Sequence, residues 1–173
     1  MNAVELLRQQ VQTGHWLLEE TVKDVTPEQA HWTPPGMAHP ISALYAHTVM
    51  GEDMLVNGML RGAAPLAMGE WAGKAGVSVP PPQEGDWSAW ARSVRVDLDA
   101  LRAYAQAVYT ATDAYLSTLT EQDLDRQIDL SGFALGQQSL GWVLSNIVGS
   151  HLNLHGGEIS ALKGAQGARG YPF

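Results

Sequence analysis

The chain has 173 residues, a formal net charge of −8 and no cysteine. A chain of this length buries about 70% of the surface that its unfolded form exposes, so we expect residues 1–173 to form a single domain. The lack of cysteine excludes disulfides, thiolate metal sites and cysteine nucleophiles. The ten basic residues are scattered rather than clustered, which argues against nucleic acid or an anionic membrane surface as a partner.

The first ten residues, MNAVELLRQQ, lack the basic and apolar regions of a signal peptide. No apolar run approaches the roughly 20 residues that span a bilayer. We therefore expect a soluble, cytoplasmic protein.

Four long segments carry the three-four spacing of apolar residues that is typical of helices, and strand-like alternation is nearly absent. The first covers about residues 3–24 and ends before Pro27. The second covers about 40–60, the third about 87–119 and the fourth about 139–163. Asp86 and Ser139 are good N-caps, and Gly62 and Gly164 are good stops. This pattern predicts an all-α, antiparallel four-helix bundle.

Two connections are longer than a minimal bundle requires. Residues 62–85, between the second and third helices, are rich in Gly, Ala and Pro, which is typical of a mobile surface segment or of a lid over a site. Residues 120–138, between the third and fourth helices, hold two short apolar pieces separated by Ser131-Gly132, and a small hairpin is expected there.

The fourth helix carries the most informative pattern. At about 100° per residue, one side of it receives most of its apolar residues and two histidines: Leu140, Leu144, Ile147, Val148, His151, Leu154, His155, Ile159 and Leu162. Because His151 and His155 lie one turn apart, both can bind one metal ion from a single helix face. Glu158 shares this sector. A lone buried carboxylate is costly, so we expect Glu158 to hydrogen-bond a ligand histidine or to bind the metal itself.

The second helix supplies a third candidate ligand, His47, at the edge of its inner face. Its neighbours one turn away, Ala43 and Gly51, are small and would leave space beside the imidazole. A lone inward histidine is more often a satisfied core residue, so His47 gains weight only beside the pair. His15 flanks the stripe of the first helix and could approach the site.

The other histidines, His31 and His39, fall in a Pro-rich loop and are expected at the surface. The Trp87/Trp90 pair is expected to be core packing. On the back of the fourth helix, small residues form a strip that predicts close packing of a neighbouring helix or of a second subunit: Gly149, Gly156, Gly157 and Ser160.

His47 and the later stretch SHLNLHGGEISALKG (residues 150–164) together resemble the DinB/YfiT-like superfamily. In that family one histidine on the second helix and an H-x3-H pair on the fourth bind a divalent metal within a four-helix bundle. The segment 156–159 looks like the family's H-x-G-Q-I ending with Glu158 where Gln is usual, and the tail 170–173, GYPF, is similar to many members. The resemblance covers essentially the whole chain. It implies that His47, His151 and His155 hold one divalent transition metal, usually zinc or nickel, in a homodimer.

Some members of this superfamily are metal-dependent transferases that join a low-molecular-weight thiol, such as bacillithiol or mycothiol, to an electrophile, and this is the activity we expect. Three histidines leave a coordination position open, as catalytic sites do. A metal-hydroxide hydrolase, a dimeric metal-binding stress-response protein without turnover, and a bundle with purely structural histidines are the alternatives. The sequence has no G-x-S-x-G, P-loop or Rossmann glycine motif.

Overall fold

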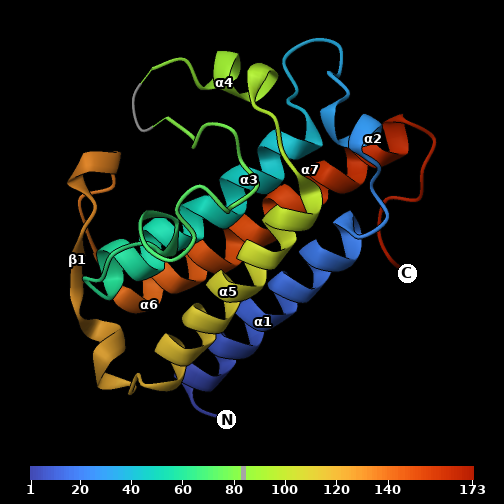
Figure 1. Cartoon of the computed structure of the whole chain (residues 1–173). Helices are drawn as coiled ribbons and strands as arrows, with labels where there is room; N and C mark the ends of the chain where they lie inside the picture. The colour runs from blue at the N-terminus through green and yellow to red at the C-terminus, as the bar shows by residue number, and fades with distance from the viewer. Residues whose placement is uncertain (83–84) are drawn as a thin grey trace.

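The computed structural model describes residues 1–82 and 85–173 (Figure 1). Its four long helical rods are α1 (Ala3–Val22), α3 (Ile41–Glu52) with its π-helical continuation η1 (Asp53–Leu60), α5 (Leu98–Ser117), and a composite of α6 (Leu140–Trp142), the π-helix η5 (Val143–Gly149) and α7 (Ser150–Ala165). Both α1 and α3 pack against α5 and against α7. The predominantly helical character predicted from the sequence is confirmed.

Shorter elements connect the rods. They are α2 (Pro27–His31), the 3₁₀-helix η2 (Leu66–Met68), α4 (Trp87–Ser93), η3 (Gln122–Asp125), β1 (Gln127–Asp129), η4 (Ser131–Phe133) and β2 (Gln137–Ser139). Strands β1 and β2 pair antiparallel with Gln127 opposite Ser139, which confirms the expected hairpin. Among the described residues, no helix combines the length and the apolar character that a membrane crossing needs.

Close contact between α1 and α7 depends on a glycine. A Cβ added at Gly14 would lie 3.1 Å from both Cβ and Cδ1 of Leu152. At the other end of the pair, the buried Lys163 donates hydrogen bonds to the carbonyl of Thr21 at 2.7 Å and to Asp24 at 2.6 Å. These contacts fix the axial position of α7 along α1. They therefore also fix the position of the histidines that α7 carries.

The third predicted helix is interrupted, which corrects the expectation of one helix over 87–119. The chain leaves the helix after α4, and Val96 pairs with Val77 in an isolated antiparallel bridge. The Val96 amide donates to Nε2 of His31 at 3.1 Å, and the Asp97 amide donates to the Gly76 carbonyl at 2.8 Å. Because these amides donate to other segments, the series of intrahelical hydrogen bonds ends before them. Asp97 then caps the start of α5.

The fourth rod departs from the ideal helical period. In η5 the amide of Ser150 donates to the carbonyl of Ser145, five residues earlier, which is the π-helical pattern. A π turn contains more residues than an α turn, so a stripe counted at about 100° per residue loses its phase there. Leu154, predicted to face the core, is 68% exposed for this reason.

The described part of the 62–85 loop is anchored to the helices. Asp53, at the start of η1, is fully buried and accepts hydrogen bonds from the amides of Leu66 at 2.9 Å and Ala67 at 3.0 Å. The same carboxylate accepts from the Tyr104 hydroxyl of α5 at 2.6 Å. The beginning of this loop is therefore bound to two rods.

The strip of small residues on the fourth rod packs within the chain. Gly149 lies against the side chain of Gln10 on α1. Further along, the C-terminal tail covers the strip: a Cβ added at Gly170 would lie 2.5 Å from Oγ of Ser160, and one added at Gly157 would lie 3.5 Å from the Tyr171 hydroxyl. Part of the surface on which we expected a helix or a second subunit is thus occupied by the tail.

Candidate metal centre

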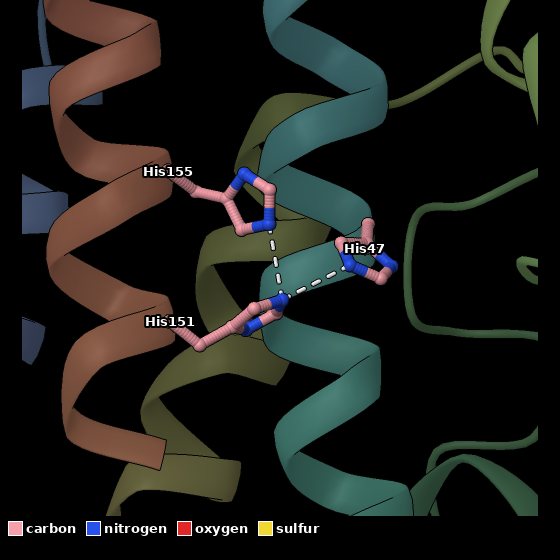
Figure 2. Close-up of side chains that lie close together, drawn as sticks. All are labelled: His47, His151 and His155. Carbon is pink, nitrogen blue, oxygen red and sulfur yellow. Dashed lines mark hydrogen bonds between the residues drawn. The ribbon is translucent and has the colours of Figure 1, made fainter. Parts of the chain in front are cut away.

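The structure brings together the three histidines predicted as ligands. His47 projects from α3 toward α7, and His151 and His155 project from α7 toward α3 (Figure 2). Nε2 of His151 lies 3.0 Å from Nε2 of His47 and 3.0 Å from Nε2 of His155. The three ligand nitrogens lie within 4.8 Å of one another. Three imidazole nitrogens so placed are positioned to hold one metal ion.

The local sequence explains this convergence. His151 and His155 occupy positions i and i+4 of the same helix, so their rings lie one above the other, with centroids 4.4 Å apart. On α3 the glycine one turn after His47 faces the pair: a Cβ added at Gly51 would lie 3.9 Å from Cε1 of His151. The space that the small residue was expected to leave beside His47 is therefore next to the His151 ring.

Burial keeps two of the imidazoles neutral. Burial, together with the charge of His155, lowers the pKa of His47 to about 4, with Glu158 opposing the shift. Burial and the neighbouring histidines lower the pKa of His151 to about 3. A metal ion needs the neutral imidazole with its nitrogen lone pair free. His47 and His151 are therefore in the protonation state that a metal requires at neutral pH.

Glu158 contacts a ligand histidine, as the sequence suggested. The Nδ1–H group of His155 donates to Oε2 of Glu158 at 2.5 Å. This bond fixes the tautomer, so that Nε2 of His155 keeps its lone pair toward the other histidines. Contrary to the expectation of a buried carboxylate, the Glu158 side chain is 56% exposed and reaches His155 from the solvent side of α7.

The nitrogen spacing fits a small divalent ion. Zn–N bonds of about 2.0–2.1 Å at tetrahedral angles separate the ligand nitrogens by roughly 3.4 Å. The two observed separations of 3.0 Å are within a few tenths of an ångström of that value. The third pair of nitrogens, on His47 and His155, lies within 4.8 Å, and we conclude that the residues present fit a three-histidine site.

The side chain of Trp87, which the sequence predicted as core packing, lies beside His47. Trp87, the first residue of α4, is half-buried and meets the His47 ring edge to face, with centroids 5.4 Å apart and planes at 82°. The sequence showed this residue only as one of a tryptophan pair expected in the core. Its position next to the site follows from the short α4 helix, which the sequence did not separate from α5.

The two loop histidines are not free surface residues. His39 is half-buried, and its ring packs edge to face on Trp87, with centroids 4.5 Å apart. Burial lowers its pKa, and Arg92 adds to the shift while Glu158 opposes it. His31 accepts the Val96 amide hydrogen bond and lies 2.9 Å from the Pro27 carbonyl through Nδ1. Both side chains are half-exposed, so the expectation of surface positions holds only in part: His31 ends α2 and bonds the segment before α5, and His39 packs against α4.

His15 belongs to a different cluster. Its Nε2 lies 2.9 and 2.8 Å from the two carboxylate oxygens of Glu52, and its ring stacks on Tyr109 at 3.8 Å. Glu52 also accepts from the Thr112 hydroxyl at 2.6 Å. His15 and Glu52 are both buried. Among the described residues this cluster does not join the group of three histidines.

A surface cavity of about 700 Å³ lies elsewhere, between α2, the segment 73–78 and the start of α5. None of the three histidines lines it. At the candidate metal centre the His155 side chain is 17% exposed and contacts the more exposed Glu158.

Comparisons with known proteins agree with the motif. A model of the DinB superfamily matches residues 10–159, which contain all three histidines. A conserved protein from Enterococcus faecalis has a crystal structure that is similar, with a TM-score of 0.79 and 22% sequence identity over 94% of this chain and 96% of that chain. At this identity the likeness shows the fold alone. No curated protein matches the chain. The family model covers most of the sequence, and the chain belongs to the DinB superfamily.

Proposed function

We propose that this protein is a metal-dependent transferase that joins a low-molecular-weight thiol to an electrophile, on an antiparallel four-helix bundle of the DinB type. The observation that carries the proposal is the convergence of three imidazole nitrogens, two of them on rings held neutral by burial. The chain has no cysteine, so a thiol nucleophile would come from a cosubstrate.

His47, His151 and His155 would hold the ion, and zinc or nickel suits three imidazole ligands. A divalent ion held by these three residues would keep at least one position for an exogenous ligand and would supply an ionised thiol or a bound water with a pKa of about 7. Glu158 orients His155 through the Nδ1 hydrogen bond, and Trp87 bounds the site beside His47. In the overall reaction a carbon–sulfur bond replaces the bond to the leaving group, which departs with its electron pair, and the thiol proton passes to solvent.

The test combines metal content with thiol turnover. Untagged protein is stripped with a chelator and reloaded with one equivalent of Zn²⁺ or Ni²⁺. The amino acid cysteine is added as the thiol cosubstrate, and the loss of its thiol is followed in the presence of 1-chloro-2,4-dinitrobenzene. We expect about one ion per chain and faster thiol loss in the loaded wild type, with both lost in His151→Ala. His31→Gln, which changes a histidine outside the group, should keep both. Thiol loss that stays faster than in a protein-free control, in metal-free protein or in His151→Ala, would rule out the proposal.

The same samples separate the alternatives. Ester hydrolysis by the loaded protein without any added thiol would favour a metal-hydroxide hydrolase, which the open three-histidine arrangement also suits. One ion per chain with no turnover of either kind would favour a metal-binding protein without catalysis. The absence of bound metal after loading would leave the histidines with a structural role.

The proposal includes a homodimer. Helices α1 and α7 pack against each other, and each leaves a large apolar side chain in solvent: Trp16 is 53% exposed and Leu154 is 68% exposed. A contiguous patch made by these two side chains would support a contact with another chain. Light scattering on the purified protein should give about twice the 18.6 kDa mass of one chain.

A further inference from the structure

The three histidines differ in how their rings are held. A histidine that binds a metal is usually oriented by a hydrogen bond from its other ring nitrogen to a carboxylate, a carbonyl or a water. His155 has such a partner in Glu158. In the part of the chain that the structure describes, His47 has only one hydrogen-bonding contact, the one between its Nε2 and His151. The aromatic contacts of His47 therefore bear on how its ring is held.

Beyond the three-histidine group, the His47 ring makes one aromatic contact among the described residues, with Trp87. The indole and the His47 imidazole meet at 82° with centroids 5.4 Å apart, within the range of edge-to-face aromatic pairs. A planar wall at this angle restricts rotation of the imidazole about its Cβ–Cγ bond. The rotation matters because it decides whether Nε2 points at His151 and His155 or away from them.

Other contacts hold the Trp87 indole in place. Trp90, one turn along α4, packs on Trp87 with centroids 5.4 Å apart and donates its Nε1–H to the Val79 carbonyl at 2.9 Å. Asp86 caps α4 by accepting from the Ala89 amide at 2.9 Å. These contacts hold Trp87, the first residue of α4, in a fixed position beside α3.

Trp87 also contacts His39. The two rings are edge to face at 4.5 Å, and Nδ1 of His39 is buried with no hydrogen-bond partner among the described residues. The loop that carries His39 is tied to α4 by Arg92, which donates to the Gly36 carbonyl at 2.8 Å. The contact with Trp87 is thus what positions the His39 ring among the described residues.

We propose that Trp87, which also contacts His39, is a positioning residue that orients the His47 imidazole and so takes the place of the hydrogen bond that Glu158 supplies to His155. The inference rests on the proposed metal site but not on the proposed reaction. Loss of a group that orients a metal-ligating histidine lowers metal affinity about 10–100-fold. Trp87→Ala should fall in that range, whereas Trp87→Phe, which keeps an aromatic edge beside His47, should bind nearly as tightly as wild type.

The experiment measures metal affinity by competition with a chromophoric chelator for Co²⁺ and Zn²⁺. Its variants are wild type, Trp87→Ala, Trp87→Phe and Trp16→Phe, the last changing an exposed tryptophan on α1. Quenching of tryptophan fluorescence by bound Co²⁺ is recorded on the same samples. Because Trp87 lies next to the site, we expect Trp87→Phe to lose most of the quenching and Trp16→Phe to keep it. Wild-type affinity in Trp87→Ala would overturn the proposal.

A second measurement needs no metal. The ring proton signals of His47, assigned with His47→Gln, are followed by NMR in metal-free protein. In Trp87→Ala the His47 signals should move, because the indole ring current is lost and the ring rotates more freely, while those of His15 stay. His47 signals that do not move would overturn the proposal even if the wild type took up no metal. A wild type that binds metal but does not turn over thiol would overturn the transferase and leave the role of Trp87 standing.

Discussion

The Nδ1–H group of His155 donates to Oε2 of Glu158 at 2.5 Å, one turn apart on the same helix. The carboxylate is more than half exposed, so it serves the histidine without joining the core. Glu158→Ala should lower metal affinity about 10–100-fold because the ring loses its partner. Glu158→Gln, whose amide oxygen can still accept the hydrogen bond but carries no charge, should lie between.

Competition titration with a chelator measures this series. Asp99→Asn is the control, since it removes one negative charge from a side chain that is 98% exposed on α5. Equal affinities for wild type and Glu158→Ala would show that the carboxylate has no part in the site.

The pair His15 and Glu52 should matter for stability rather than for metal binding. Their side chains are 9% and 3% exposed, and leaving a buried polar group without its hydrogen-bond partner costs about 1–3 kcal/mol. Glu52→Ala should therefore lower the free energy of unfolding by about that amount in urea. Glu20→Ala, which breaks a surface pair with Lys23, should cost less than about 1 kcal/mol. A metal stoichiometry reduced in His15→Gln would contradict the separation of the two clusters.

The glycine between α1 and α7 predicts a contrast between two alanine substitutions. Alanine gains up to about 1 kcal/mol over glycine inside a helix. At Gly156, where an added Cβ meets nothing within 4 Å, that gain should appear. At Gly14 the same methyl group would press on Leu152 at 3.1 Å, and overpacking costs about 1–3 kcal/mol. Gly14→Ala should thus be less stable than Gly156→Ala by about 1–3 kcal/mol, and equal urea midpoints would show that Leu152 moves aside freely.

Glu19 should make stability depend on pH. It accepts hydrogen bonds from the hydroxyls of Tyr45 at 2.8 Å and Tyr109 at 2.9 Å, and burial raises its pKa above the ordinary value of 4.5. Because the folded protein holds this proton more tightly, the contribution of Glu19 favours folding below pH 4.5 and is lost as the pH rises through the raised pKa.

Glu19→Gln keeps an uncharged acceptor at every pH. It should therefore be more stable than wild type at pH 7, and the difference should shrink toward pH 4. Urea unfolding at both pH values measures it. A difference that grows on acidification would mean that the ionised carboxylate stabilises the fold.

Much of the site could be predicted because its signals are local. His151 and His155 lie one turn apart on one helix, and Glu158 is one turn further, so the spacing alone places all three. The pairing with His47 depended on the family resemblance, since one inward histidine on another helix carries little weight by itself.

Other features could not be predicted because tertiary contacts override the local pattern. The break before α5 exists because Val96 and Asp97 bond to His31 and Gly76, which are distant in sequence. The apolar periodicity continues through this break. Trp87 was consequently placed in a long helix, and its contacts with His39 and His47 were missed. The π-helix before His151 likewise leaves no mark in the residue pattern.

The carboxylate of Asp53 also has a consequence for how the molecule opens. The amides of Leu66 and Ala67 lie in a loop, yet both end on a fully buried group that is bonded to Tyr104 of α5. These amides exchange with solvent only when their hydrogen bonds to this buried carboxylate break. Their hydrogen exchange should be as slow as that of the helices, so this stretch of loop belongs to the same cooperative unfolding unit as the core.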